Sequence, residues 1–226
     1  MWLYHFTKAL HPLFSQYWSW DVRGPGVGRV PDDGPLIVAM NHVSFLDPWF
    51  LQQVFPRSLH YLINETWYRR SPIWRFFFDA NGTIPVGSEA RSTVNILARA
   101  LERGASIGIF PEGAISPTGS IQRFRPGVAR LAAKTGAPVM PVGIRGARES
   151  IPKGRHWPRP GPIHLYLGTP YVFPGSPWRG RVPPRDATRV FQRRTFEKIC
   201  ALSGQPVPDL ERLRSPRARP RVQAIS

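Results

Sequence analysis

Short aliphatic runs that indicate buried β-strands alternate with amphipathic stretches along most of this 226-residue chain. The clearest run is Leu36–Met40, five apolar residues without a polar interruption, and Val139–Ile144 is similar. Strands buried on both faces need helices above and below them, and parallel strands need long crossover connections. The alternation therefore predicts an α/β fold with a mostly parallel sheet flanked by helices.

Further elements follow from the same patterns. Apolar or alternating runs predict strands at Leu59–Ile63, Thr83–Val86, Ile107–Phe110 and Ile163–Leu167, the last near an edge of the sheet. Helical spacing predicts helices at Leu46–Phe55, Thr66–Asp79 with an interruption near Pro72, a segment capped by Ser92 and stopped by Gly104, Pro126–Thr135 and Asp186–Ser203.

The first twenty residues carry apolar and aromatic side chains at steps of mostly three and four: Trp2, Leu3, Phe6, Leu10, Leu13, Phe14, Tyr17 and Trp18. This spacing predicts an amphipathic aromatic helix, kinked at Pro12. Such a helix suits a membrane headgroup boundary, and it also suits packing on the core; the pattern leaves both open. We expect residues 1–22 to be a membrane-interface helix, 23–203 one folded domain, and 204–226 a disordered basic tail rich in Pro and Arg.

The charge balance is strongly basic, with 31 Lys and Arg against 14 Asp and Glu and a net charge of +17. Such a field attracts nucleic acid, an acidic membrane surface, or acidic substrates and carriers, and charge alone does not choose among them. The single cysteine, Cys200, excludes an intrachain disulfide and a cysteine-based zinc site. No run of residues approaches the roughly 18 apolar positions of a membrane span.

The strongest local signal is the segment Asn41–Pro48, which follows a buried strand directly. His42 then lies at the carboxyl end of that strand, where ligand crevices of parallel sheets form. Asp47, about one helical turn further on, is placed to orient the His42 imidazole, as general-base catalysis requires. The alternative is structural: Asp47 as a helix N-cap before a first-turn proline.

A second segment places Glu112 and Gly113 at the carboxyl end of another strand. Downstream, Phe124–Gly127 opens a helix, whose free N–H groups together with the cation of Arg125 suit a phosphate. The alternative is an ordinary strand, turn and helix with a solvated arginine.

Together these segments resemble the glycerolipid acyltransferase family, whose best-known member acts on 1-acyl-glycerol-3-phosphate. The family's motif N-H-x-x-x-x-D matches Asn41, His42 and Asp47, and its F-P-E-G-T-R-S motif matches Phe110–Gly113 and Ser116. Its F-K-x-G, V-P-V and G-x-I-x-V-D-R elements match Phe124–Gly127, Val139–Val142 and, in part, Gly82–Val86. Order and spacing agree over roughly residues 25 to 170.

The resemblance implies an enzyme that moves a fatty acyl group from a thioester to the free hydroxyl of a lysophospholipid, above all 1-acyl-glycerol-3-phosphate. It implies His42 and Asp47 as the catalytic pair and makes residues 23–203 the acyltransferase domain. The implied substrate-binding residues are Glu112, Gly113, Arg125, Arg91, Gly82, Thr83, Ile84 and Pro85. It implies no metal and no cofactor, and its acyl donor is acyl-CoA or acyl carrier protein.

Two departures from the family pattern concern the acceptor head group. Ala114 and Ile115 stand where Thr and Arg are usual, and Gly87 and Ser88 replace Asp-Arg, although Arg91 lies three residues on. Another lysolipid or an amino-lipid therefore stays open as the acceptor.

The rival from another class is a nucleic-acid-binding protein acting through the Arg-rich tail, but no known nucleic-acid module is recognised and we expect no such partner. We instead expect peripheral attachment to an anionic membrane surface, on the cytoplasmic face.

Overall fold

A seven-stranded sheet in the order β1-β7-β6-β2-β5-β3-β4 forms the centre of the chain. The computed structural model describes residue 6 and residues 8–87, 89–150, 157–178 and 183–207. The strands are β1 (Trp18–Arg23), β2 (Leu36–Met40), β3 (His60–Asn64), β4 (Ile84–Val86), β5 (Ser106–Ile109), β6 (Val139–Arg145) and β7 (Gly161–Leu167). The helices include α2 (His11–Phe14), α3 (Asp47–Val54), α4 (Glu65–Tyr68), α5 (Pro72–Ala80), α6 (Ala90–Glu102), α7 (Gly127–Thr135), α8 (Ala147–Ser150) and α9 (Arg185–Ser203).

Neighbouring strands are parallel except β6 and β7, so the predicted α/β fold with a mostly parallel sheet is confirmed. Because β7 reverses and β1 follows its direction, β1 and β7 begin at the edge where the other five strands end. His42 follows the end of β2 at this edge, which we call the His42 edge.

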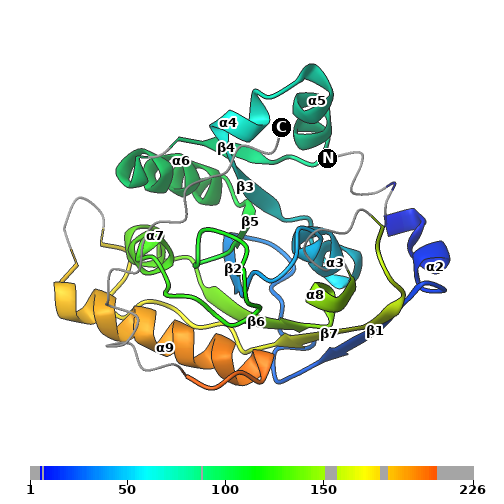
Figure 1. Cartoon of the computed structure of the whole chain (residues 1–226). Coiled ribbons are helices and arrows are strands. Elements are labelled where there is room, and N and C mark those ends of the chain that lie inside the picture. Colours follow the sequence, from blue (N-terminus) through cyan, green and yellow to red (C-terminus); the bar gives the residue numbers. More distant parts are fainter. Residues whose placement is uncertain (1–5, 7, 88, 151–156, 179–182, 208–226) are drawn as a thin grey trace.

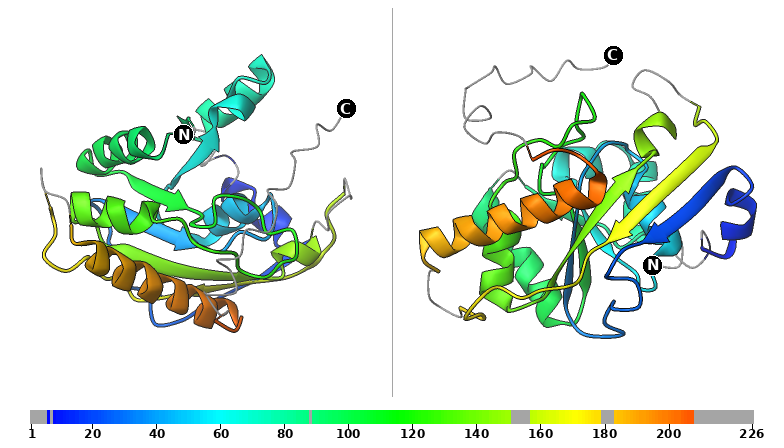
Figure 2. Two further views of the ribbon diagram at one scale, coloured as in Figure 1. Left: turned by 60° about the vertical axis from the view of Figure 1, so that its left-hand side comes forward. Right: turned by 90° about the horizontal axis from the view of Figure 1, so that it is seen from below.

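Two apolar layers cover the sheet. Ile37 and Ala39 of β2 point into a cluster with α6, α7 and α9, while Val38 and Met40 point into one with α3 and β1. Both sets are fully buried, which explains why β2 is apolar throughout. In Figure 1, α9 lies along β6, and in both Figure 1 and the left view of Figure 2, α4 and α5 project beyond the sheet.

The helix predicted over the first twenty residues is wrong from Trp18 onwards. Phe6, Lys8 and Ala9 are helical and α2 follows, but Trp18–Arg23 is β1, paired in parallel with β7. Trp18 and Trp20 both pack on Phe50 with an exposed serine between them, which is the period of a strand. The predicted boundary after residue 22 falls inside β1, and residues 1–5 and 7 lie outside the described part.

The remaining elements begin and end close to their predicted positions. The interruption at Pro72 is confirmed, since it separates α4 from α5. The predicted cap at Ser92 is wrong, because the N-cap of α6 is Glu89 and Ser92 lies inside the helix. Gly204, at φ 67°, ends α9 as a left-handed cap, while most of the predicted basic tail, residues 208–226, lies outside the described residues. Among the described helices, none has the length and apolar character needed to cross a bilayer.

Asn41 joins β2 to β6 through its side chain. The fully buried amide donates from Nδ2 to the Ile144 carbonyl at 3.1 Å and accepts at Oδ1 from the Ile144 N–H at 2.9 Å. Asn41→Ala leaves both backbone groups buried without partners, so we expect the free energy of unfolding to fall by about 2–4 kcal/mol in urea denaturation.

The matched control is Asn81→Ala, which removes one exposed hydrogen bond from the Asn81 side-chain amide to the Phe77 carbonyl. This variant should lower the free energy of unfolding by less than about 1 kcal/mol, because water replaces the lost partner. Equal losses in the two variants would contradict the bridging role of Asn41.

Candidate active site

The Asp47 carboxylate gathers the loop that follows β2. Its Oδ2 accepts three hydrogen bonds, from His42 Nδ1 at 2.8 Å, the Val43 N–H at 2.7 Å and the Ser44 N–H at 2.8 Å. Because Oδ2 already accepts from two backbone N–H groups, it also acts as an acceptor towards the His42 ring. Nδ1 therefore carries the hydrogen of this bond, and Nε2 presents a lone pair. The structure thus brings His42 and Asp47 into contact, as their spacing predicts.

The N-cap alternative for Asp47 is wrong. The N-cap position of α3 is Leu46, which makes no side-chain cap, and Asp47 is the first helical residue. Its partners lie upstream in the His42 loop and not in the first turn of the helix. The proline in that first turn matches the expectation for Pro48.

Burial and hydrogen bonding act in opposite directions on the Asp47 carboxyl. Complete burial raises its pKa above the ordinary value of 3.8, while the His42 ring and the two backbone N–H groups favour the carboxylate. Oδ1 has no hydrogen-bond partner among the described residues. Burial also raises the pKa of the neighbouring Tyr61 phenol well above its ordinary value, and the charge of Asp47 adds to that rise.

Two aromatic rings hold the histidine. The His42 ring stacks on Phe110 with centroids 3.9 Å apart and an interplanar angle of 17°, and Phe110 stacks on Tyr61 at 6.1 Å. The Tyr61 hydroxyl donates to the Pro48 carbonyl at 3.0 Å. The His42 side chain is 15% exposed. Phe110 belongs to a sequence motif but nothing in the motif marks it as a partner of His42. No local pattern marks Tyr61, because its position depends on the pairing of β3 with β5.

Glu112 ties the loop after β5 to the histidine. Its Oε1 accepts from the His42 N–H at 2.8 Å and its Oε2 accepts from the Gln122 N–H at 2.8 Å. Glu112 is 6% exposed, and burial raises the pKa of its carboxyl while these N–H groups oppose the rise. The structure therefore gives Glu112 a positioning contact to His42, whereas the sequence predicted a contact with substrate.

Gly113 and Arg125 meet beside this carboxylate. Gly113 has φ 76°, and a Cβ added there would lie 2.7 Å from Arg125 Nε, so the arginine side chain lies directly over the glycine. The Arg125 N–H donates to the Pro111 carbonyl at 2.8 Å. The Arg125 side chain is exposed and makes no ion pair within the described part of the chain. His42, Glu112, Gly113 and Arg125 thus form one cluster.

The predicted residues Gly82, Thr83, Ile84 and Pro85 lie apart from His42. They lead into and form β4, which is three strands from β2, roughly 14 Å at about 4.8 Å per strand. The Gly82 carbonyl lies 2.6 Å from His60 Nδ1, near the beginning of β3. Arg91 is exposed in the first turn of α6, after the end of β4, on the His42 edge but again beyond β5 and β3.

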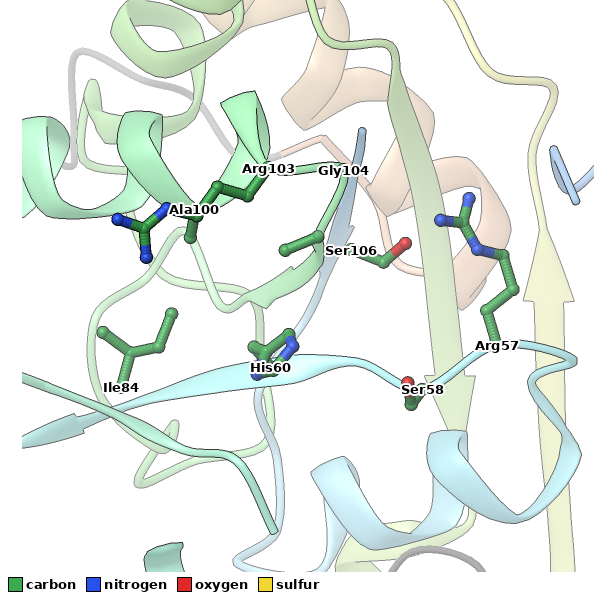
Figure 3. Close-up of a pocket in the computed structure, with 9 residues that line it drawn as sticks. Arg57, Ser58, His60, Ile84, Ala100, Arg103, Gly104 and Ser106 are labelled. Carbon is green, nitrogen blue, oxygen red and sulfur yellow. The ribbon is translucent and has the colours of Figure 1, made fainter. Parts of the chain in front are cut away.

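A hollow of about 490 Å³ lies at the opposite edge, where β3 and β5 begin. Figure 3 shows Arg57, His60, Ile84, Arg103 and Ser106 around it. The Arg57 guanidinium is already bound to the backbone carbonyls of Pro31, Asp33 and Gly34. Because the hollow opens at the opposite edge of the sheet, it is separate from the His42 cluster. Ile84 lines the hollow and not the cluster.

These features define an α/β protein with a carboxylate-oriented histidine at the carboxyl edge of its sheet. A family model described as Acyltransferase matches residues 22–145, more than half of the chain. The chain therefore belongs to the acyltransferase family, as the sequence motifs predict.

Several relatives carry the name 1-acyl-sn-glycerol-3-phosphate acyltransferase. A chloroplastic one from Brassica napus is 31% identical over 67% of this chain, and one from Arabidopsis thaliana is 32% identical over 67%. The chain spans 45% and 43% of their lengths, which is less than half of each. The crystal structure of the Thermotoga maritima 1-acyl-sn-glycerophosphate acyltransferase PlsC has the same fold, with a TM-score of 0.67, 23% identity, and coverage of 96% of this chain and 81% of that one.

The substitution Asp47→Asn tests the raised pKa of the Asp47 carboxyl through the pH dependence of the free energy of unfolding. The folded protein holds the Asp47 proton more tightly than the unfolded chain, so ionisation costs wild-type stability as pH rises from about 4 through the raised pKa. Asn has no such proton to lose and its oxygen still accepts the three hydrogen bonds. We expect the stability of Asp47→Asn relative to wild type to increase from about pH 4 to pH 7 in urea denaturation, and a constant difference would contradict the raised pKa.

Proposed function

We propose that this chain transfers a fatty acyl group from an acyl thioester to the free hydroxyl of a lysophospholipid, with 1-acyl-glycerol-3-phosphate as acceptor and phosphatidic acid as product. The observation that carries the proposal is the His42 ring, held at Nδ1 by Asp47 with Nε2 available at the His42 edge. Family membership and the names of the relatives support the choice of reaction.

In the proposed mechanism His42 is the general base. Nε2 removes the proton from the acceptor hydroxyl as that oxygen attacks the thioester carbonyl. The tetrahedral intermediate then collapses, the carbon–sulfur bond breaks, and the leaving thiolate takes the proton from the His42 imidazolium. Asp47 orients the ring and stabilises its positive charge between these steps. The acceptor oxygen is itself the nucleophile, so no acyl-enzyme forms.

Arg125 is the proposed anchor of the acceptor phosphate. Its exposed side chain lies over Gly113, whose neighbour Glu112 accepts the His42 N–H, so a phosphate on Arg125 would hold its glycerol hydroxyl near the histidine. The first-turn N–H groups of α7 begin just beyond this residue and favour an anion. Arg91, on α6 at the same edge but beyond β5 and β3, is the second proposed anchor.

The proposed acyl donor is acyl-CoA or acyl carrier protein, and the proposed site of action is an anionic membrane surface. Both donors are acidic, as is the membrane, and both complement the net charge of +17. Because these donors are cytoplasmic molecules, we propose peripheral attachment on the cytoplasmic face.

Two observations favour a second acceptor. Ile115 stands where the family's phosphate-binding arginine is usual, and a relative named lyso-ornithine lipid O-acyltransferase from Pseudomonas aeruginosa is 27% identical over 52% of this chain and 46% of its own length. An amino-lipid acceptor is therefore the alternative.

The direct test incubates the purified protein with labelled acyl-CoA or acyl carrier protein and a panel of lysolipids, and identifies the product by mass spectrometry. His42→Ala should lower turnover by about 10²- to 10⁴-fold, because no other base replaces Nε2. His60→Ala, at the opposite edge of the sheet, is the matched control and should keep most of the activity. Turnover by His42→Ala near the wild-type rate would exclude this mechanism.

Arg125→Ala tests the acceptor phosphate. Losing one charge-assisted contact should raise the acceptor KM by about 10- to 100-fold and change the donor KM much less. Arg123→Ala, an exposed arginine two positions away, is the control and should leave both constants near their wild-type values. Unchanged acceptor KM in both Arg125→Ala and Arg91→Ala would favour the amino-lipid acceptor.

A further inference from the structure

The exposed aromatic side chains of the described residues are not spread evenly over the surface. They are Phe6, Tyr17, Phe45, Trp67, Trp74, Phe76, Phe77 and Trp157. Apart from Phe6, each comes from a segment that enters or leaves the sheet at the His42 edge. Tyr17 and Trp157 precede β1 and β7, Phe45 follows β2, and the others belong to the α4–α5 connection that leaves β3.

Apart from Phe6, Ile73 and Ile115, the other exposed large apolar side chains are of another kind. In the described residues they are single aliphatic residues on separate elements: Leu13, Val22, Val27, Ile96, Val172, Val190 and Val207. Single exposed aliphatic residues are ordinary on protein surfaces, whereas clustered exposed aromatic residues mark an interaction surface. Tryptophan, tyrosine and phenylalanine are also the residues that partition into the headgroup region of a bilayer.

The α4–α5 connection is well anchored although its outer face is exposed. Phe78 is buried and stacks on Trp74 with centroids 5.8 Å apart, and the Tyr68 hydroxyl donates to Asp79 at 2.6 Å, joining the two helices. On the outer face, Ile73 is 80% exposed and Phe77 is 45% exposed. This fixed projection, which stands clear of the sheet in Figures 1 and 2, therefore presents its apolar side chains without local unfolding.

Basic side chains lie among these aromatic residues. The Arg70 guanidinium lies 4.8 Å from the centre of the Trp67 ring and has no carboxylate partner in the described part of the chain. Arg69 pairs with Glu65 on the same helix. Arg125 adds an exposed cation in the loop after β5, at the same edge. Interleaved arginine and aromatic side chains complement anionic phospholipid headgroups above an apolar interior.

We propose that α4–α5, Phe45 and Ile115 form the surface by which this protein docks on an anionic phospholipid bilayer. Phe45 and Ile115 are 59% and 41% exposed and flank the histidine, since Ser116, next to Ile115, donates its N–H to the His42 carbonyl at 2.8 Å. Docking here turns His42 towards the lipid, so an acceptor reaches the base without leaving the membrane; this functional meaning rests on the proposed acyl transfer.

Site-specific labelling tests the orientation. Cys200 is buried, so Ile73→Cys can carry an environment-sensitive fluorophore, and Val190→Cys on α9 is the control at an exposed aliphatic residue. Vesicles of phosphatidylcholine with phosphatidylglycerol should shift the emission at position 73 to the blue and leave position 190 unchanged. Vesicles of phosphatidylcholine alone should give a smaller emission shift at position 73, because they lack anionic headgroups. Equal shifts at both positions, or none at position 73, would overturn the proposal.

A pair of double variants separates docking from catalysis. Ile73→Ser/Phe77→Ser should lower the vesicle partition coefficient by about tenfold or more, whereas Val172→Ser/Val190→Ser should leave it unchanged. Both variants should keep the wild-type circular dichroism spectrum and wild-type kcat/KM with a water-soluble short-chain acceptor, and only the first should lose activity on vesicle-borne acceptor. Unchanged partitioning of the first variant overturns the docking surface. Absence of acyl transfer in every protein, wild type included, overturns the proposed function while partitioning still reports on docking.

Discussion

Much of the candidate site depends on one buried oxygen. Asp47 Oδ2 accepts from His42 Nδ1 and from the N–H groups of Val43 and Ser44, so a single atom fixes both the ring and the backbone that carries it. Glu112 repeats this arrangement from β5, with one oxygen on the His42 N–H and the other on the Gln122 N–H. Loops that follow neighbouring parallel strands are thereby joined by hydrogen bonds, in addition to the stacking of His42 on Phe110.

The two buried carboxylates of the candidate site and its exposed arginines lie in different environments. Asp47 and Glu112 are buried, and the desolvation of their carboxylates is partly offset by hydrogen bonds from backbone N–H groups and, for Asp47, from the His42 ring. Arg70 and Arg125 are exposed, and neither has a carboxylate partner in the described part of the chain. The two carboxylates therefore fix the geometry of the site, while the exposed cations are the groups on which the proposed binding of anionic substrates, carriers and lipids depends.

Sequence patterns predicted the secondary structure correctly where a segment had a single apolar pattern. They were wrong where a helical segment and a strand followed one another directly. The run Leu36–Met40 was predicted as a strand with the bounds it has in the structure, because burial on both faces leaves a purely apolar signature. At the N-terminus, aromatic residues of a helical segment and of β1 follow one another, and their combined spacing imitated a single helix. Trp18 and Trp20 belong to the sheet because both rings pack on Phe50, a contact between segments about thirty residues apart that no local pattern contains.

The family, the mostly parallel α/β sheet and the nearness of His42 to Asp47 all follow from local sequence patterns. His42 lies near Asp47 because a strand followed closely by a helix confines the two side chains to a few geometries. Tertiary structure decided which distant residues join them. It brought Glu112, Phe110 and Arg125 to the histidine through the pairing of β2 with β5, and it placed Gly82 and Ile84 beside His60 instead. It also reversed β1 and β7, so that Tyr17 and Trp157 lie at the His42 edge. Strand order and direction depend on pairing between segments far apart in the chain. They determine which exposed side chains and which charged groups lie near the histidine.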